Sequence, residues 1–169
     1  ACPARMPVVV VDKASPDATA GAARAARPDA QIIENARNLG FGAGCNRGLD
    51  AVCTEYALLA NPDARLTEAA IAALVAAADS FREAQLIAPL IADEAGQPVH
   101  SWNVAQPRRR HLPRDRRGEP WPAGPFCADY ASGACLLLRP AEGLRFDENF
   151  FLFYEDDDLC ARAGGAVVV

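Results

Sequence analysis

The sequence is poor in the residues that build metal frameworks. Of its 169 residues only two are histidine, and its six cysteines form no CxxC pair and no zinc-ligand spacing. Most of these cysteines stand beside alanine, leucine or valine, where a thiol behaves as a small buried apolar group. The composition therefore argues against a zinc-binding module and favours reduced thiols in a reducing cytoplasm.

Three further classes of protein are disfavoured: secreted proteins, membrane-spanning proteins and general nucleic-acid binders. It contains no segment patterned as a secretory signal and no apolar run long enough to cross a membrane. Lysine and arginine number 17 against 22 aspartate and glutamate, and the resulting net charge of −5 argues against a general nucleic-acid binder. We therefore expect a globular cytoplasmic protein that has no nucleic acid among its partners.

One basic segment departs from this acidic balance. Residues 107–120, PRRRHLPRDRRGEP, hold six arginines and three prolines. Such a composition is typical of a flexible surface loop. Alternatively, the segment lies over a functional site, where arginine meets the phosphates of an acceptor or an anionic membrane surface. The sequence leaves both interpretations open.

Apolar strand-like runs alternate with alanine-rich helical runs, which predicts an α/β fold built from parallel βαβ units. The predicted strands are 7–11, 31–34, 56–60 and 86–91, and the predicted helices are 18–26, 43–55 and 67–78. Thr67 is placed to cap the last of these helices, and Pro89 predicts an edge or a bend in the last strand. The length suits one domain. Because the chain lacks an initial methionine and has strand-like runs at both ends, we expect residues 1–169 to be a fragment of that domain.

Polar residues follow three of the predicted strands, at the sheet edge where α/β proteins bind their ligands. They are Asp12, the loop NLGFGAGCN at 38–46, and Asn61-Pro62-Asp63. Each is also an ordinary turn sequence. The glycine loop either makes a tight turn or brings backbone amides to a phosphate at the start of a helix. It lacks the GxGxxG spacing, which excludes a nicotinamide cofactor of the Rossmann type.

The segment FLFYEDDDLC, 151–160, places four carboxylates directly after an apolar run. The apolar residues 151–154 predict a buried strand. The acids are either a solvated surface feature or a strand end that delivers one carboxylate into a pocket. Asp157 and Asp158 are expected in the first turn of a following helix, where acids face the positive end of the dipole.

Five segments together resemble one enzyme family. They are VVVVDKASPD, ENARNLGFGAGCNRGL, YALLANPDARL, ASGACLLLR and FDENFFLFYEDDDLCAR. In this order they resemble the family 2 glycosyltransferases, in particular the bacterial rhamnosyltransferase-like branch, over Val8 to Arg162. The resemblance implies a GT-A fold, which is a Rossmann-like α/β fold with a mixed, mainly parallel sheet flanked by helices. It also implies that residues 1–169 are one catalytic domain lacking its first strand and its C-terminal part.

The resemblance implies an activity and a set of site residues. The activity is inverting transfer of a sugar, rhamnose from a dTDP donor in this branch, to a cell-envelope glycan or lipid-linked acceptor at the inner face of the membrane. Asp156 matches the catalytic base, with Glu155 beside it, and Asp63 matches the ligand of Mg²⁺ or Mn²⁺. The implied donor-binding residues are Asp12, Asn38, Gly40, Asn46, Asn61, Asp63 and Gly133.

One departure from the family pattern supports a rival interpretation. Lys13 stands where family members carry an asparagine after the acid of the VVVVD strand. Either the lysine side chain points to solvent or it disturbs binding of the nucleotide base. In the second case the chain is a non-catalytic or degenerate nucleotide-binding module.

Overall fold

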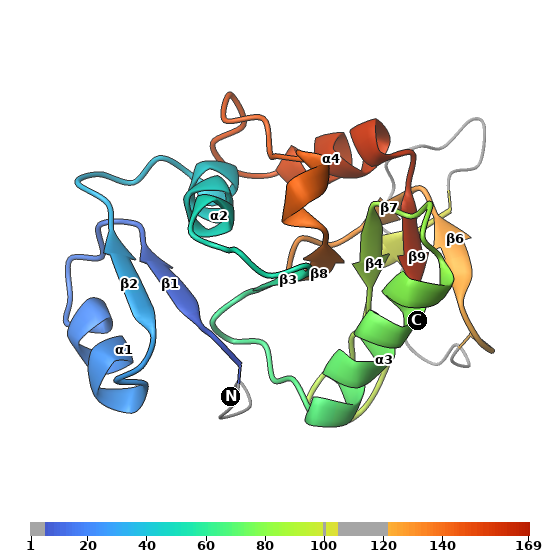
Figure 1. Cartoon of the computed structure of the whole chain (residues 1–169), viewed down its shortest axis with the longest axis horizontal. Helices are drawn as coiled ribbons and strands as arrows, with labels where there is room; N and C mark the ends of the chain where they lie inside the picture. Colours follow the sequence, from blue (N-terminus) through green and yellow to red (C-terminus); the bar gives the residue numbers. More distant parts are fainter. Residues whose placement is uncertain (1–5, 100, 105–121) are drawn as a thin grey trace.

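The computed structural model describes residues 6–99, 101–104 and 122–169 (Figure 1). The α-helices are α1 (Thr19–Ala26), α2 (Phe41–Asp50), α3 (Glu68–Ser80) and α4 (Glu155–Ala163). The strands are β1 (Val9–Asp12), β2 (Gln31–Glu34), β3 (Ala57–Ala60), β4 (Leu86–Ala88), β5 (Trp102–Asn103), β6 (Phe126–Ala128), β7 (Tyr130–Ala131), β8 (Cys135–Leu138) and β9 (Ala166–Val168). The arginine-rich segment 107–120 lies outside the described residues. Of the helices just named, none is both long and apolar enough to cross a bilayer.

The first part of the chain forms a small parallel βαβ unit, drawn in blue in Figure 1. β1 and β2 pair in parallel, from Val9 opposite Gln31 to Asp12 opposite Glu34. Helix α1 connects them and packs on both, while α2 packs against β1. The predicted strand at 31–34 and the predicted helix at 18–26 are confirmed, the helix to within one residue.

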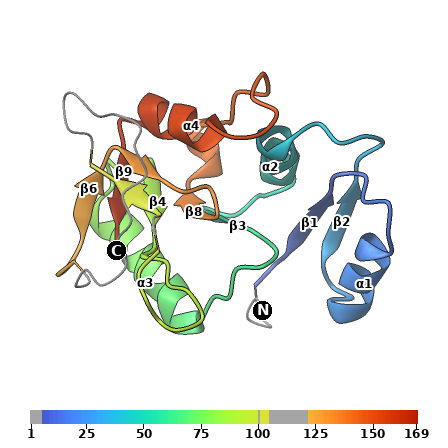
Figure 2. The same cartoon turned by 180° about the vertical axis from the view of Figure 1, so that it is seen from behind.

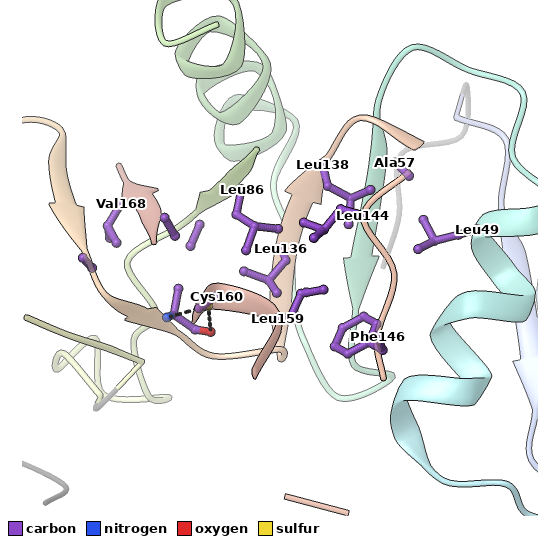
Figure 3. Close-up of a cluster of buried hydrophobic side chains, with 14 residues drawn as sticks. Leu49, Ala57, Leu86, Leu136, Leu138, Leu144, Phe146, Leu159, Cys160 and Val168 are labelled. Atoms are coloured by element: carbon purple, nitrogen blue, oxygen red, sulfur yellow. Dashed lines mark hydrogen bonds between the residues drawn. The ribbon is translucent and has the colours of Figure 1, made fainter. Parts of the chain in front are cut away.

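The rest of the chain is built around a five-stranded sheet in the order β3-β8-β4-β9-β6. Side chains that alternate along its strands point to opposite faces. One face packs against α3, through a cluster of Leu74, Ala77, Ala78, Ile87, Leu137 and Val167. The other face packs against α4 and the end of α2, through residues that include Leu49, Leu86, Leu136, Leu159, Cys160 and Val168 (Figure 3). This second cluster supports the helix that carries the acidic run.

The prediction of a mainly parallel sheet is wrong for these five strands. β4 and β9 are parallel, but the ladders β3–β8, β4–β8 and β6–β9 are antiparallel. The physical reason is that β8, which comes late in the chain, lies between β3 and β4 and runs against both. Strands adjacent in sequence are therefore separated in space, and the sheet is mixed.

Two local predictions also need correction. β4 is central rather than at an edge, and it ends at Ala88, directly before Pro89, which has no amide hydrogen for the ladder. Helix α2 begins at Phe41 and ends at Asp50, earlier at both ends than expected, so that Gly42 and Gly44 lie inside it. The predicted Thr67 cap is confirmed, because its hydroxyl accepts a hydrogen bond from the Ala70 amide at 3.1 Å.

The predicted buried strand at 151–154 is not formed. These residues make a loop of bends, and their side chains are 55–70% exposed. Phe153 and Tyr154 both have a φ of 68°, in the left-handed region that bulky residues seldom adopt. Such angles cannot continue a strand, so the loop turns directly into α4 and leaves four large apolar side chains at the surface.

Candidate active site

Asp156 lies in the first turn of α4, where three donors converge on its carboxylate. Oδ2 accepts hydrogen bonds from the Tyr130 hydroxyl at 3.1 Å and from the Gly133 amide at 3.0 Å. Oδ1 accepts one from the amide of Asp157 at 3.0 Å. The side chain is half-buried. Asp156 is therefore held in one orientation while it keeps access to solvent.

Tyr130 reaches Asp156 because β7 packs directly on α4. Burial raises the pKa of the Tyr130 hydroxyl far above its ordinary value, and the Asp156 carboxylate raises it further. The phenol thus stays protonated at neutral pH and remains a donor. Sequence reasoning missed this residue, although an aromatic residue three positions before the glycine of ASGAC was a usable signal.

Gly133 occupies the point where the 132–134 turn meets α2 and α4. A Cβ atom at this position would lie 3.1 Å from Cε1 of Phe41 and 3.4 Å from Cβ of Asp156. The family resemblance implies that Gly133 contacts the donor, and that stays a prediction. The groups that approach are Phe41 and Asp156, so Gly133 helps to place the acid.

Glu155 and Asp158, two other acids of the run, have different environments. Glu155 is the first residue of α4 and only 6% exposed. Its Oε2 is buried without a hydrogen-bond partner among the described residues. Asp158 pairs with Arg162 one turn later, at 2.6 Å. All four acids lie in the first helical turn, not only the last two as predicted, because α4 begins at Glu155.

The Asn61-Pro62-Asp63 turn lies beside the same site. The amide of Asn61 donates to the carbonyl of Ala134 at 2.9 Å, which joins the end of β3 to the turn that carries Gly133. Asp63 is exposed. The structure thus brings the candidate metal ligand to the same sheet edge as the candidate base.

At the carboxyl ends of β1 and β2, two polar side chains are buried. Asp12 is 8% exposed and accepts from the amide of Ser15 at 3.2 Å. Asn35, which sequence reasoning missed, is 6% exposed. Lys13 is half-buried, and its ammonium nitrogen lies 5.8 Å from the centre of the Phe41 ring. Lys13 therefore turns toward the site rather than to bulk solvent.

Three further predicted donor-binding residues serve the local structure. Asn38 accepts a hydrogen bond from the Gly40 amide at 2.9 Å. Gly40 has a φ of 98°, and a Cβ there would lie 2.4 Å from the carbonyl oxygen of Phe151. Asn46 donates to the Phe146 carbonyl at 3.0 Å and accepts from the Phe146 amide at 2.9 Å. These contacts fix the start of α2 against the segment that leads into α4.

A thiol also lies close to the site, in α2. Burial raises the pKa of Cys45 to about 12, while the nearby Lys13 ammonium opposes that rise. At neutral pH the thiol is protonated, so it is not an activated nucleophile.

Asn61 and Asp63 fit a divalent cation whose remaining ligands come from water and a phosphate group. Within the described residues, no three side chains of histidine, cysteine, aspartate or glutamate gather to form a protein cage for a metal. Mg²⁺ commonly takes only one or two carboxylates and completes its shell with water and substrate phosphates. Asp63, exposed and next to Asn61, offers that kind of partial site.

Comparison with protein families decides the affiliation of the chain. The model of glycosyl transferase family 2 matches residues 3–137. The chain belongs to glycosyl transferase family 2. This family assignment confirms the resemblance that the five sequence segments carry.

A curated relative is the N-acetylglucosaminyl-diphospho-decaprenol L-rhamnosyltransferase of Mycobacterium tuberculosis strain H37Rv, which is 28% identical over 194 residues. The match covers 94% of this chain and 61% of the relative. The chain thus spans less than two thirds of that relative's length.

Solved structures confirm the GT-A fold. Staphylococcus aureus TarS 1-349 in complex with UDP matches with a TM-score of 0.62 and 17% identity, over 96% of this chain and 48% of TarS. GalNAc-T7 with UDP, GalNAc and Mn²⁺ matches with a TM-score of 0.68 and 14% identity, over 96% of this chain and 36% of GalNAc-T7. At these identities the likeness concerns the fold, and it agrees with the mixed sheet and flanking helices of this family 2 chain (Figure 2).

Proposed function

We propose that the full-length protein is an inverting glycosyltransferase that moves a sugar from a nucleoside diphosphate to an acceptor hydroxyl. The observation that carries this proposal is the fixed carboxylate of Asp156, oriented by Tyr130 and Gly133. The backbone hydrogen bond from Asn61 to Ala134 holds the Asn61-Pro62-Asp63 turn next to this carboxylate, which supports the role we propose for Asp63 at the donor diphosphate. In this proposal Asp156 acts on the acceptor and Asp63 holds the cation of the donor, and both residues lie at one edge of the sheet.

In this mechanism Asp156 takes the proton of the acceptor hydroxyl. The hydroxyl oxygen forms a bond to the anomeric carbon from the face opposite the leaving group. The bond from that carbon to the diphosphate breaks, and the nucleoside diphosphate leaves with the electron pair. Asp63 would hold Mg²⁺ or Mn²⁺, and the cation would supply positive charge to stabilise the leaving diphosphate.

The supporting residues have separate tasks. Tyr130 and the Gly133 amide hold the Asp156 carboxylate. We assign Asp12, which is buried at the end of β1, to contact with the nucleotide base. Glu155 is buried beneath the surface, so we assign it to positioning α4 rather than to contact with the acceptor. Because both ends of the Asn46 side-chain amide pair with Phe146, we assign Asn46 to holding that segment rather than to donor binding.

For the substrates we propose rhamnose from a dTDP donor and a glycan or lipid-linked acceptor of the cell envelope. The support is the name of the mycobacterial relative, which describes rhamnosyl transfer to a diphospho-decaprenol acceptor. A lipid-linked acceptor would bring the protein to the cytoplasmic face of the membrane as a peripheral protein. The exposed apolar loop 151–154, next to Asp156, suits that placement.

The rival is a non-catalytic nucleotide-binding module, and one observation favours it. Lys13 replaces the asparagine of the family and turns toward the site. Incubation of the full-length protein with a panel of nucleotide-sugars, with Mn²⁺ or with a chelator, separates the two. We expect release of free nucleoside diphosphate that needs the cation, from at least one donor. Thermal stabilisation by a donor without any release, even with acceptor extracts, would instead support the module.

A further inference from the structure

Asn35 is a buried amide without a hydrogen-bond partner. Its side chain is 6% exposed, and neither Oδ1 nor Nδ2 has a partner among the described residues. Folded proteins pair most buried polar atoms, so an unpaired amide with both ends buried calls for an explanation. One explanation is that the side-chain amide forms its hydrogen bonds with a ligand when one is bound.

The position of Asn35 points to the nucleotide end of the site. Asn35 follows β2 directly, and its backbone amide donates to the carbonyl of Asp12, at the end of β1, at 2.9 Å. The two residues are therefore neighbours at the carboxyl ends of adjacent parallel strands, the edge at which such sheets bind ligands. Both side chains are more than nine-tenths buried.

The pair offers a defined set of hydrogen-bonding groups. The Asp12 carboxylate accepts, and the Asn35 amide donates through Nδ2 and accepts through Oδ1. Such a pair is complementary to a base edge on which a ring N–H stands beside a carbonyl group. Uracil, thymine and guanine carry that edge. Cytosine and adenine instead turn an unprotonated ring nitrogen toward the carboxylate, which repels it.

We propose that Asn35 is a base-reading residue of the donor site and that, together with Asp12, it selects bases with a ring N–H beside a carbonyl. The proposal rests on the proposed function, because it concerns the nucleotide of the same donor. It assigns to Asn35 a specificity role that is separate from the transfer chemistry at Asp156.

Asn46 supplies a matched control for the test. It is also an asparagine, 8% exposed, but its amide is paired at both ends with Phe146 and also donates to Glu148 at 2.9 Å. Asn35→Leu and Asn46→Leu make the same change of similar volume at similar burial. If Asn35 is unpaired in the free protein, Asn46→Leu lowers stability and Asn35→Leu does not.

The experiment uses the full-length protein and two readouts. Without nucleotide, we expect Asn35→Leu to leave the melting temperature unchanged or to raise it by about 2 to 4 °C, and Asn46→Leu to lower it by about 4 °C or more. By calorimetry with Mn²⁺, at least one of UDP, dTDP and GDP should bind the wild type about tenfold or more tighter than CDP and ADP. Asn35→Leu should weaken that binding by about tenfold or more.

Three results would overturn the proposal. The first is a melting temperature of Asn35→Leu that falls as far as that of Asn46→Leu, since that result would make Asn35 a structural residue. The other two are unchanged nucleotide binding by Asn35→Leu and a wild-type preference for CDP or ADP. A wild type that binds none of the five nucleotides would overturn the proposed function and this assignment together, whereas the three results above leave the proposed function standing.

Discussion

Gly40 is the residue at which one added methyl group should disrupt the contact between the start of α2 and the 151–154 loop. Its φ of 98° and ψ of 178° lie in a region that is almost confined to glycine, and it abuts the loop that leads into α4. The backbone amide of the next residue, Phe41, donates to the carbonyl of Phe151 at 3.2 Å. Replacing Gly40 by alanine should strain its backbone angles, its contact with the loop and the hydrogen bond from Phe41 to Phe151.

The magnitude follows from the contacts. Alanine in this conformation costs about 1–3 kcal/mol. Its Cβ would stand 2.4 Å from the Phe151 oxygen, a backbone atom that cannot rotate away, so the bond from Phe41 must lengthen or break at a cost of about 1 kcal/mol. We expect Gly40→Ala to lower the free energy of unfolding by about 2–4 kcal/mol.

Urea unfolding of the full-length protein measures this loss, and Gly21→Ala is the matched control. Gly21 lies in α1, and a methyl group added there would meet nothing within 4 Å, so the same substitution should stabilise by up to about 1 kcal/mol. Sugar transfer should also fall in Gly40→Ala, because the loop and α4 shift together. A Gly40→Ala protein as stable as the wild type would refute the close approach of α2 and the 151–154 loop.

Four further predictions concern the hydroxyl beside Asp156, the thiols and a helix cap. Tyr130→Phe removes one hydrogen bond to Asp156 and should lower the free energy of unfolding by about 1–2 kcal/mol. It should also slow the transfer step while the affinity for the sugar donor stays unchanged. An unchanged transfer rate would show that the hydroxyl does not position the acid. Among the five cysteines in the described residues, thiol labelling at pH 7 should modify the exposed Cys53 and Cys127 quickly. The more shielded Cys45, Cys135 and Cys160 should react only after unfolding. Burial raises the pKa values of the three shielded thiols to about 11 or 12. Above about pH 9 the unfolded chain therefore loses protons that the folded chain keeps, so the free energy of unfolding should fall as the pH rises. A free energy of unfolding that stays constant from about pH 8 to 10 would contradict this. Thr67→Ala should cost about 1 kcal/mol in urea unfolding through loss of the α3 cap, and no loss would mean that the cap is not formed in solution.

The order of the elements was predictable because local patterns determine it. The β-branched run before Asp12 and the alanine-rich run after it are visible without any tertiary knowledge, and both form as expected. The position of β8 between β3 and β4 was not predictable, because it depends on contacts between segments far apart in the chain. The run 151–154 misled for a related reason. Its apolar side chains predict burial, and nothing local reveals that Phe153 and Tyr154 adopt left-handed angles at the surface.

The candidate site was predictable at the level of motifs but not at the level of individual roles. Asn35, Asn38 and Asn46 look alike in sequence, and only the fold separates an unpaired amide from a turn former and from a paired amide that reaches Phe146. Tyr130 was missed because its link to Asp156 spans 26 residues and needs β7 to pack on α4.

The most direct test of the account is the transfer rate of Asp156→Asn in the full-length protein, measured beside Asp158→Asn. The amide cannot take the acceptor proton, so we expect transfer to fall by about a hundredfold to ten-thousandfold while donor affinity stays within about twofold. Asp158, which pairs with Arg162 on the surface of the same helix, should tolerate the same change with little effect. A wild-type transfer rate in Asp156→Asn would contradict the assignment of Asp156 as the base.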